Sequence, residues 1–178
     1  EFRRVLFRSF FVPDQGGSLL SSSNAEGGIH QLIIPFGAVL IDRGFTTSNS
    51  LSPISYLLTG DAPNRILKVE WKNCGFFYDL EDDGESTDYI NFQLWLYESN
   101  GMIEIHYGPH KITQLHLAYN YETGPQVSII PAYYVEQDSI STSSLWLFGA
   151  ATNPNMVTSG IPFFLEGNIP INKVFRFK

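Results

Sequence analysis

Residues 66–71 read ILKVEW and residues 89–107 read YINFQLWLYESNGMIEIHY, and these two runs decide the fold. In the second run, apolar and polar residues alternate on both sides of Asn100-Gly101. Asn-Gly between two alternating runs is the strongest short-range signal for a β-hairpin, because both central residues of a type I′ turn need a positive φ. The sequence therefore predicts a hairpin with a two-residue turn, in which Trp95 lies opposite His106.

The alternation in this hairpin separates an inner face from an outer face. The inner face is apolar and is predicted to be core: Phe92, Leu94, Leu96, Ile103, Ile105 and Tyr107. The outer face is polar and aromatic: Asn91, Gln93, Trp95, Tyr97, Glu104 and His106. In the first run, the same alternation directs Leu67, Val69 and Trp71 inward and Lys68 and Glu70 outward.

The rest of the chain also consists of short apolar runs separated by turns. Further strand candidates are residues 29–34, 36–41, 54–58, 115–121, 127–130, 133–136, 145–148 and 174–177. We expect Pro35 and Pro131 to interrupt strands. No window of a dozen residues keeps a helical apolar period without Pro or Gly. The pattern therefore predicts an all-β fold, an antiparallel, jelly-roll-like β-sandwich with no long helix.

Length and composition exclude several classes of function. The chain has 178 residues, the size of one domain, and carries 11 basic against 18 acidic residues, a net charge of −7. Such a surface repels phosphate backbones, so we expect no nucleic-acid partner. No apolar run approaches the roughly 18 residues of a membrane span. Cys74 is the single cysteine and is expected to be a buried small hydrophobe rather than a nucleophile.

The N-terminus needs separate treatment. Arg4-Val5-Leu6-Phe7-Arg8-Ser9 matches the in-frame translation of a common short-read sequencing adaptor, so we interpret residues 1–9 as an artefact. The alternatives are a genuine terminal strand or a disordered tail. With residues 1–9 set aside, residues 10–178 form a single β-sandwich domain that we expect to be truncated at its N-terminus.

An acidic stretch precedes the hairpin. Asp79, Glu81 and Asp83, followed by Gly84, resemble the first half of an EF-hand loop, in which oxygen ligands alternate around a glycine turn. The twelfth position is Ile90 instead of a bidentate Glu. Two interpretations remain open: a Ca²⁺ ion bound by the three carboxylates, or a solvated loop that keeps the end of a sheet soluble. No other cofactor is expected.

The outer face of the hairpin is the best binding candidate. It combines Gln93, Trp95, Tyr97, Glu104 and His106. Aromatic rings next to amide and carboxylate groups are suited to stacking on a sugar ring or to anchoring a protein interface. The alternative is that a second layer covers this face and makes it ordinary core.

Signatures of catalysis are weak. Glu70 and Glu104 are the candidate carboxylate pair of a glycoside hydrolase, but we favour a cross-strand ion pair in which Lys68 is the partner of either residue. His106 and His110 are separated by Gly-Pro, which argues against a zinc site. No Gly-x-Ser-x-Gly elbow and no phosphate-binding loop is present. We therefore expect no catalytic residues and no enzymatic activity.

Several motifs together resemble a known kind of module. Residues 52–56 read SPISY, residues 60–73 read GDAPNRILKVEWKN, and residues 91–98 read NFQLWLYE, followed by IEI at 103–105. Over about residues 29–178, the chain resembles the N-terminal β-rich module of large secreted proteins that carry a type IX secretion (type A) sorting domain. It departs from such modules in two ways: their upstream strands are absent or replaced here, and the sorting domain does not occur within this sequence.

The resemblance implies an extracellular or cell-surface module with a spacer or recognition role. Its partners would be other domains of the parent protein, or a glycan or protein at the cell surface. The second interpretation is a carbohydrate-binding module or, less favoured, a glycoside hydrolase domain.

Overall fold

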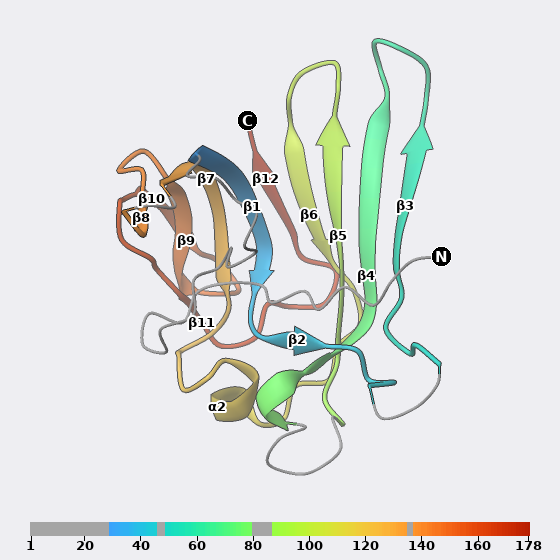
Figure 1. Cartoon of the computed structure of the whole chain (residues 1–178), viewed down its shortest axis with the longest axis vertical. Coiled ribbons are helices and arrows are strands. Elements are labelled where there is room, and N and C mark those ends of the chain that lie inside the picture. Colours follow the sequence, from blue (N-terminus) through green and yellow to red (C-terminus); the bar gives the residue numbers. More distant parts are fainter. Residues whose placement is uncertain (1–28, 46–48, 80–86, 135–136) are drawn as a thin grey trace.

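The computed structural model describes residues 29–45, 49–79, 87–134 and 137–178. The segment 1–9, interpreted above as adaptor sequence, lies outside the described residues. The described residues form two packed sheets (Figure 1), so the predicted antiparallel β-sandwich is confirmed. The longest helix within these ranges, α2 (Leu115–Ala118), has four residues, and none is long and apolar enough to cross a membrane.

The first sheet has the strand order β1-β7-β9-β10. Its strands are β1 (Ile29–Gly37), β7 (Gln126–Tyr134), β9 (Leu145–Ala150) and β10 (Asn155–Thr158), with β8 (Ser139–Ile140) beside β7 and β11 (Leu165–Glu166) beside β9. The β9–β11 pair is parallel and the other pairs are antiparallel. The sequence reasoning did not predict β8, β10 or β11.

The second sheet has the strand order β12-β6-β5-β4 and carries the candidate site. Its strands are β12 (Val174–Phe177), β6 (Ile103–Tyr107), β5 (Ile90–Tyr97) and β4 (Ile66–Phe76), with β2 (Leu40–Ile41) and β3 (Ile54–Thr59) both paired to β4. β3 to β6 are consecutive in the chain and form an antiparallel meander.

The main core lies between the sheets and contains the predicted inner face of the hairpin. Phe92, Leu94, Ile105 and Tyr107 are buried there, and Trp71 packs against them from β4, with its ring centroid 4.9 Å from that of Phe92. A second cluster lies on the other face of the first sheet and includes Ile34, Ile130, Tyr133 and Trp146. The face assignment made from alternation is therefore confirmed.

The register of the hairpin differs from the prediction by two residues. Trp95 lies opposite Glu104, not opposite His106. The loop is longer than the expected type I′ turn, and within it only Gly101 has a positive φ, of 68°. The Glu98 N–H donates to the Arg65 carbonyl oxygen at 2.9 Å, so the pairing of this segment with β4 continues one residue beyond Tyr97. A shift of two residues keeps every side chain on its predicted face.

Pro35 and Pro131 do not interrupt their strands, contrary to expectation. Pro35 lies within β1 and Pro131 within β7, each at an irregularity of the β1–β7 register. At these points two residues of one strand lie opposite one residue of the other, which is a β-bulge, where a missing N–H is tolerated. The Pro35 carbonyl oxygen accepts a hydrogen bond from the Tyr107 hydroxyl at 2.6 Å, which ties β1 to the second sheet.

The strand predicted at 115–121 is also wrong, because this segment contains α2. Leu117, Ala118 and Tyr119 are consecutive and all buried, which a strand with alternating faces does not allow. The Asp88 carboxylate accepts hydrogen bonds from the backbone N–H groups of Thr113 and Gln114, just before the helical turn. Tertiary contacts of this kind override the local strand propensity.

Candidate functional site

The outer face of the second sheet brings the predicted binding residues together. In antiparallel strands, directly opposite residues point to the same face. One row across the sheet consists of Lys68, Trp95, Glu104 and Arg176. The neighbouring row consists of Glu70, Gln93, His106 and Val174. Tyr97 reaches the first row because its hydroxyl donates to Glu104.

Trp95 is covered on both ring faces by its neighbours. The Lys68 ammonium of β4 lies 3.7 Å from the ring centroid, a cation–π contact. The His106 ring of β6 stacks on the indole with centroids 4.1 Å apart and planes 27° apart. Because β4 and β6 flank β5, these groups cover opposite sides of the ring. The indole N–H donates to the Gln93 side-chain oxygen at 2.8 Å. The Lys68 and His106 contacts therefore compete with any sugar ring for the faces of the indole.

Glu104 is a buried carboxylate with three hydrogen-bond donors. It accepts from Arg176 Nε at 2.6 Å, from the Tyr97 hydroxyl at 2.8 Å and from His106 Nε2 at 2.9 Å. An ionised carboxylate only accepts, so His106 carries its proton on Nε2. Burial alone would raise the pKa of Glu104, but the bonds from these three residues outweigh it and hold the pKa below its ordinary value. Glu104 therefore remains ionised, and both of its carboxylate oxygens accept hydrogen bonds.

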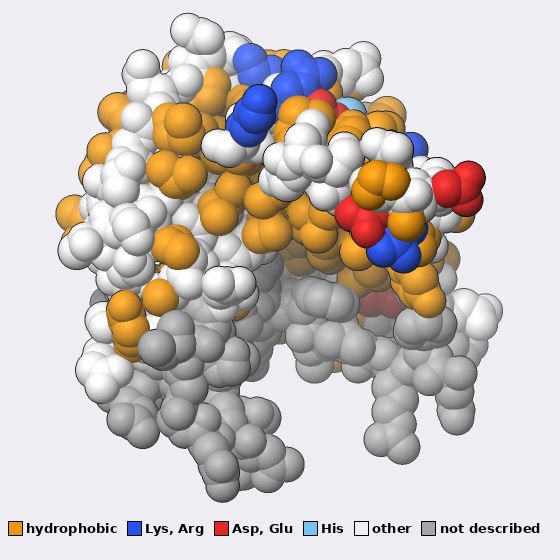
Figure 2. All heavy atoms as spheres, turned by 90° about the horizontal axis from the view of Figure 1, so that it is seen from above, with side chains coloured by type: hydrophobic (Ala, Val, Ile, Leu, Met, Phe, Trp, Pro, Cys, Tyr) orange, Lys and Arg blue, Asp and Glu red, His pale blue; other side chains and the backbone are white. Residues whose placement is uncertain are grey.

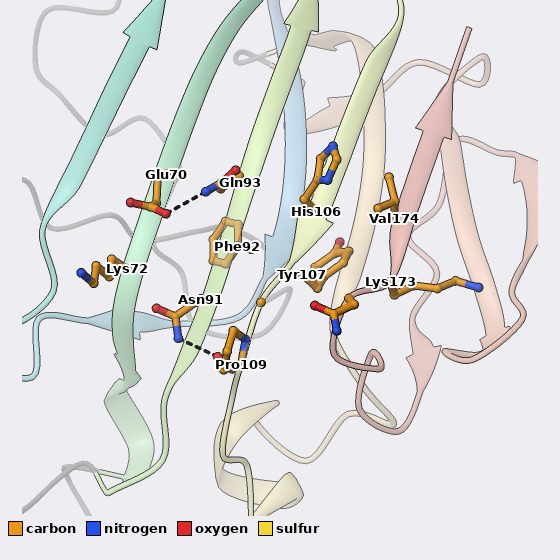
Figure 3. A pocket seen from close by; sticks show the side chains of 12 residues that line it. Glu70, Lys72, Asn91, Phe92, Gln93, His106, Tyr107, Pro109, Lys173 and Val174 are labelled. Atoms are coloured by element: carbon orange, nitrogen blue, oxygen red, sulfur yellow. Dashed lines mark hydrogen bonds between the residues drawn. The ribbon is translucent and has the colours of Figure 1, made fainter.

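A hollow of about 580 Å³ lies beside this cluster on the same face (Figure 3). Its lining residues come from β4, β5, β6, the start of β12, and the loops that follow β6 and precede β12. Glu70 accepts a hydrogen bond from the Gln93 amide at 2.7 Å, and the Asn91 amide donates to the Pro109 carbonyl oxygen at 2.6 Å. His106 also lines the hollow and so links it to the Trp95 cluster. The lining combines polar side chains with apolar surface, and two pairs of its groups bond to one another.

The geometry corrects the expected pairing of carboxylates with Lys68. Glu70 lies on β4 and Glu104 on β6, and β5 separates their strands. Glu104 forms its ion pair with Arg176, while Lys68 lies over Trp95. The sequence reasoning missed Arg176, whose only local signal was a basic residue between Phe175 and Phe177 on the closing strand.

The proposed calcium ligands are only partly within the described residues. Asp79 is buried, and one of its carboxylate oxygens accepts the Asp88 N–H at 3.3 Å. Glu81 and Asp83 lie outside the described residues, so the Ca²⁺ interpretation remains a prediction. Within the described ranges, no group of three or more potential metal-binding side chains is found.

Cys74 is a buried hydrophobe, as expected. It is 5 % exposed, and burial, followed by the charge of Asp42, raises the pKa of its thiol to about 12. A thiol in this environment does not supply a nucleophilic thiolate near neutral pH.

A family model described as NIDO related matches residues 15–155. No curated protein and no solved structure gave a significant match. The family match provides no evidence for the type IX sorting-domain context that the sequence motifs resemble.

Proposed function

The chain belongs to the NIDO-related family, and from this premise we propose that it is a non-enzymatic recognition or spacer module of an extracellular multidomain protein. NIDO domains occur in extracellular proteins, which supports an extracellular location for this domain. The natural partners in this proposal are other domains of the parent protein or a protein at the cell surface.

One observation supports the non-enzymatic assignment: the polar side chains on the outer face of the second sheet form hydrogen bonds with one another. Glu104 accepts from three donors and is kept ionised, so it does not supply the proton that a glycosidase acid must give. The Glu70 carboxylate is bonded to Gln93. These contacts are typical of side chains that stabilise a sheet surface, not of groups held ready for reaction.

A second candidate function is carbohydrate binding, and the hollow favours it more than Trp95 does. A sugar in the hollow would donate hydrogen bonds to the Glu70 carboxylate and bond to neighbouring polar groups, without stacking on Trp95. This candidate predicts that the substitution Glu70→Gln weakens binding, whereas Trp95→Ala acts only through stability.

Binding and hydrolysis assays with insoluble polysaccharides and a glycan array separate the candidates. For the recognition or spacer module, we expect no hydrolysis and no saturable glycan binding by the wild-type chain. Saturable binding that is lost in Glu70→Gln, while folding is retained, would replace the first proposal with the second. Hydrolysis that is lost in Glu70→Gln would contradict the non-enzymatic assignment.

The compartment is tested independently. In intact cells that produce the parent protein, an antibody against this domain should label the surface or recover the protein from the medium. Protection of the domain from external protease until the cells are lysed would contradict the extracellular assignment.

A further inference from the structure

The loop between β5 and β6 carries the one Asn-Gly pair of the sequence, Asn100-Gly101. Figure 1 shows this loop projecting from one end of the second sheet, and Figure 2 looks down on that end of the molecule. Both residues are exposed. A methyl group on the Cα of Gly101 would meet no atom within 4 Å apart from its neighbours in the chain. Water and hydroxide therefore reach the peptide group that joins the two residues.

The side chain of Asn100 is folded over the backbone that follows it. Its Oδ1 accepts the Met102 N–H at 2.9 Å, which is the bond of an Asx turn. The ring that this bond closes contains both the Asn100 Cγ and the Gly101 nitrogen, the atom whose attack on Cγ would form a cyclic imide. The Met102 N–H also polarises the carbonyl group of the side chain and stabilises the negative charge that develops on Oδ1 during such an attack.

The amide nitrogen of Asn100 is free to leave. Within the described part of the chain, the Asn100 Nδ2 has no hydrogen-bond partner. Other asparagines donate their Nδ2 to a backbone carbonyl oxygen: Asn73, Asn91 and Asn168. Loss of ammonia from those residues would break a contact of the fold, whereas its loss from Asn100 breaks none.

We propose that Asn100-Gly101 is a spontaneous deamidation site of the folded domain, at which water converts the side-chain amide of Asn100 into a carboxylate. Hydroxide removes the proton of the Gly101 nitrogen, and this nitrogen forms a bond to the Asn100 Cγ. The Cγ–Nδ2 bond breaks, and Nδ2 takes up a proton from water and leaves as ammonia. Glycine permits this attack because it has no Cβ to crowd the nitrogen.

Water then opens the cyclic imide at either of its two carbonyl groups. One product is aspartate, and the other is isoaspartate, in which the backbone runs through the former side chain. Both products add one negative charge to a chain whose net charge is −7. Isoaspartate also lengthens the loop backbone by one carbon between Tyr97 and Met102, whose backbone groups pair at the base of the loop.

One contact slows the reaction in the folded chain. The Gly101 N–H donates to the Tyr97 carbonyl oxygen at 3.0 Å, and this bond must open before the nitrogen attacks. An exposed loop tip opens locally at a much lower free energy than global unfolding requires. Deamidation therefore proceeds from the native fold, but more slowly than in an unstructured peptide of the same sequence.

Incubation of the folded chain in mildly alkaline buffer, followed by digestion at acidic pH and mass spectrometry, tests the proposal. We expect the mass increase that accompanies replacement of NH₂ by OH in the peptide that contains Asn100, divided between aspartate and isoaspartate. The rate should rise with pH. Low concentrations of urea, which multiply the globally unfolded fraction, should leave the rate nearly unchanged. A synthetic peptide of residues 94–105 should react faster.

Asn64 is the control within the same chain. It is also exposed and lies in the turn between β3 and β4, but Arg65 follows it, and a side chain at that position hinders the attack. Asn64 should therefore remain unchanged. Gly101→Ala should slow the reaction at Asn100 by about tenfold or more. Asn100→Gln should not react on the same timescale, because its longer side chain must close a larger ring.

Four outcomes would overturn the proposal. The first is an unchanged Asn100 in the folded chain after the peptide has reacted completely. The second is equal deamidation of Asn64. The third is a rate that follows the globally unfolded fraction in urea. The last is a folded Gly101→Ala or Asn100→Gln variant that reacts as fast as the wild-type chain.

Discussion

Glu104 illustrates how a single charged residue is stabilised on the face of this sheet. Glu104 is 5 % exposed, and its carboxylate accepts hydrogen bonds from Tyr97 of β5, His106 of β6 and Arg176 of β12. A buried carboxylate is tolerated only when such partners replace water. The cluster therefore joins three strands by side-chain bonds in addition to the backbone ladder.

Glu104→Gln is expected to lower the free energy of unfolding at pH 7 by about 1–3 kcal/mol. The amide replaces one acceptor oxygen with a donor that faces other donors. The pKa of Glu104 is below its unfolded value of 4.5, so this stabilisation is complete above pH 4.5 and disappears as the pH falls through the folded-state pKa. Urea denaturation at a series of pH values should show that the free energies of unfolding of the wild-type chain and of Glu104→Gln become equal at acidic pH.

The control for this prediction is Glu98→Gln. Glu98 pairs with Arg65 at the surface, where solvent screens the interaction. Its substitution should have a smaller effect at pH 7. An equal effect of the two substitutions would show that burial of Glu104 does not matter.

Cys74 should not react with a thiol reagent in the folded protein. Burial raises the pKa of the thiol to about 12, so both access and thiolate are lacking. Ellman's reagent should modify one thiol per chain only after denaturant is added. Rapid modification in native buffer would contradict the assignment of Cys74 to the core.

At the scale of elements, the loop between β5 and β6 differs from a type I′ turn in needing only one left-handed residue. The left-handed conformation is needed only at Gly101, whose Cβ position would be free of steric contacts. Asn100 instead accepts the Met102 N–H through its side-chain oxygen at 2.9 Å. A type I′ turn would require the left-handed conformation at both residues.

Gly101→Ala should therefore destabilise the protein by about 1 kcal/mol, from backbone strain alone. Asn100→Ala should lower the free energy of unfolding by a smaller amount, because only one exposed hydrogen bond is lost. Chemical denaturation of both variants checks this order. A larger loss for Asn100→Ala would indicate that the tighter turn forms in solution.

At the scale of the whole molecule, one core joins the two sheets. Phe36, Val127 and Leu147 of the first sheet and Phe92 and Ile105 of the second belong to the same buried cluster. Because neither sheet can cover this surface alone, we expect the two sheets to unfold together.

Native-state hydrogen exchange tests this cooperativity. The slowest amides of β7 and β5, the central strands of the two sheets, should exchange with the same free energy, equal to that of global unfolding. If β5 amides exchange through an opening of distinctly lower free energy while β7 amides remain protected, the second sheet unfolds as a separate unit.

Much of the fold and part of the candidate site were predictable from local patterns. The period of two assigned Phe92 and Ile105 to the core and Trp95 and Glu104 to the outer face, and the structure confirms both assignments. Local patterns succeed here because each side chain's face depends only on its neighbours along one strand. A register shift of two residues leaves these faces unchanged.

Register, bulges and side-chain partners were decided by the tertiary structure. The bond from Glu98 to Arg65 joins residues 33 positions apart, and that from Arg176 to Glu104 joins residues 72 apart. Whether Pro35 breaks a strand depends on the bulge opposite β7, and whether Trp95 offers a ring face depends on Lys68 and His106. The sequence by itself determined strands and faces, which are local, whereas pairing energies involve segments that meet only in the folded chain.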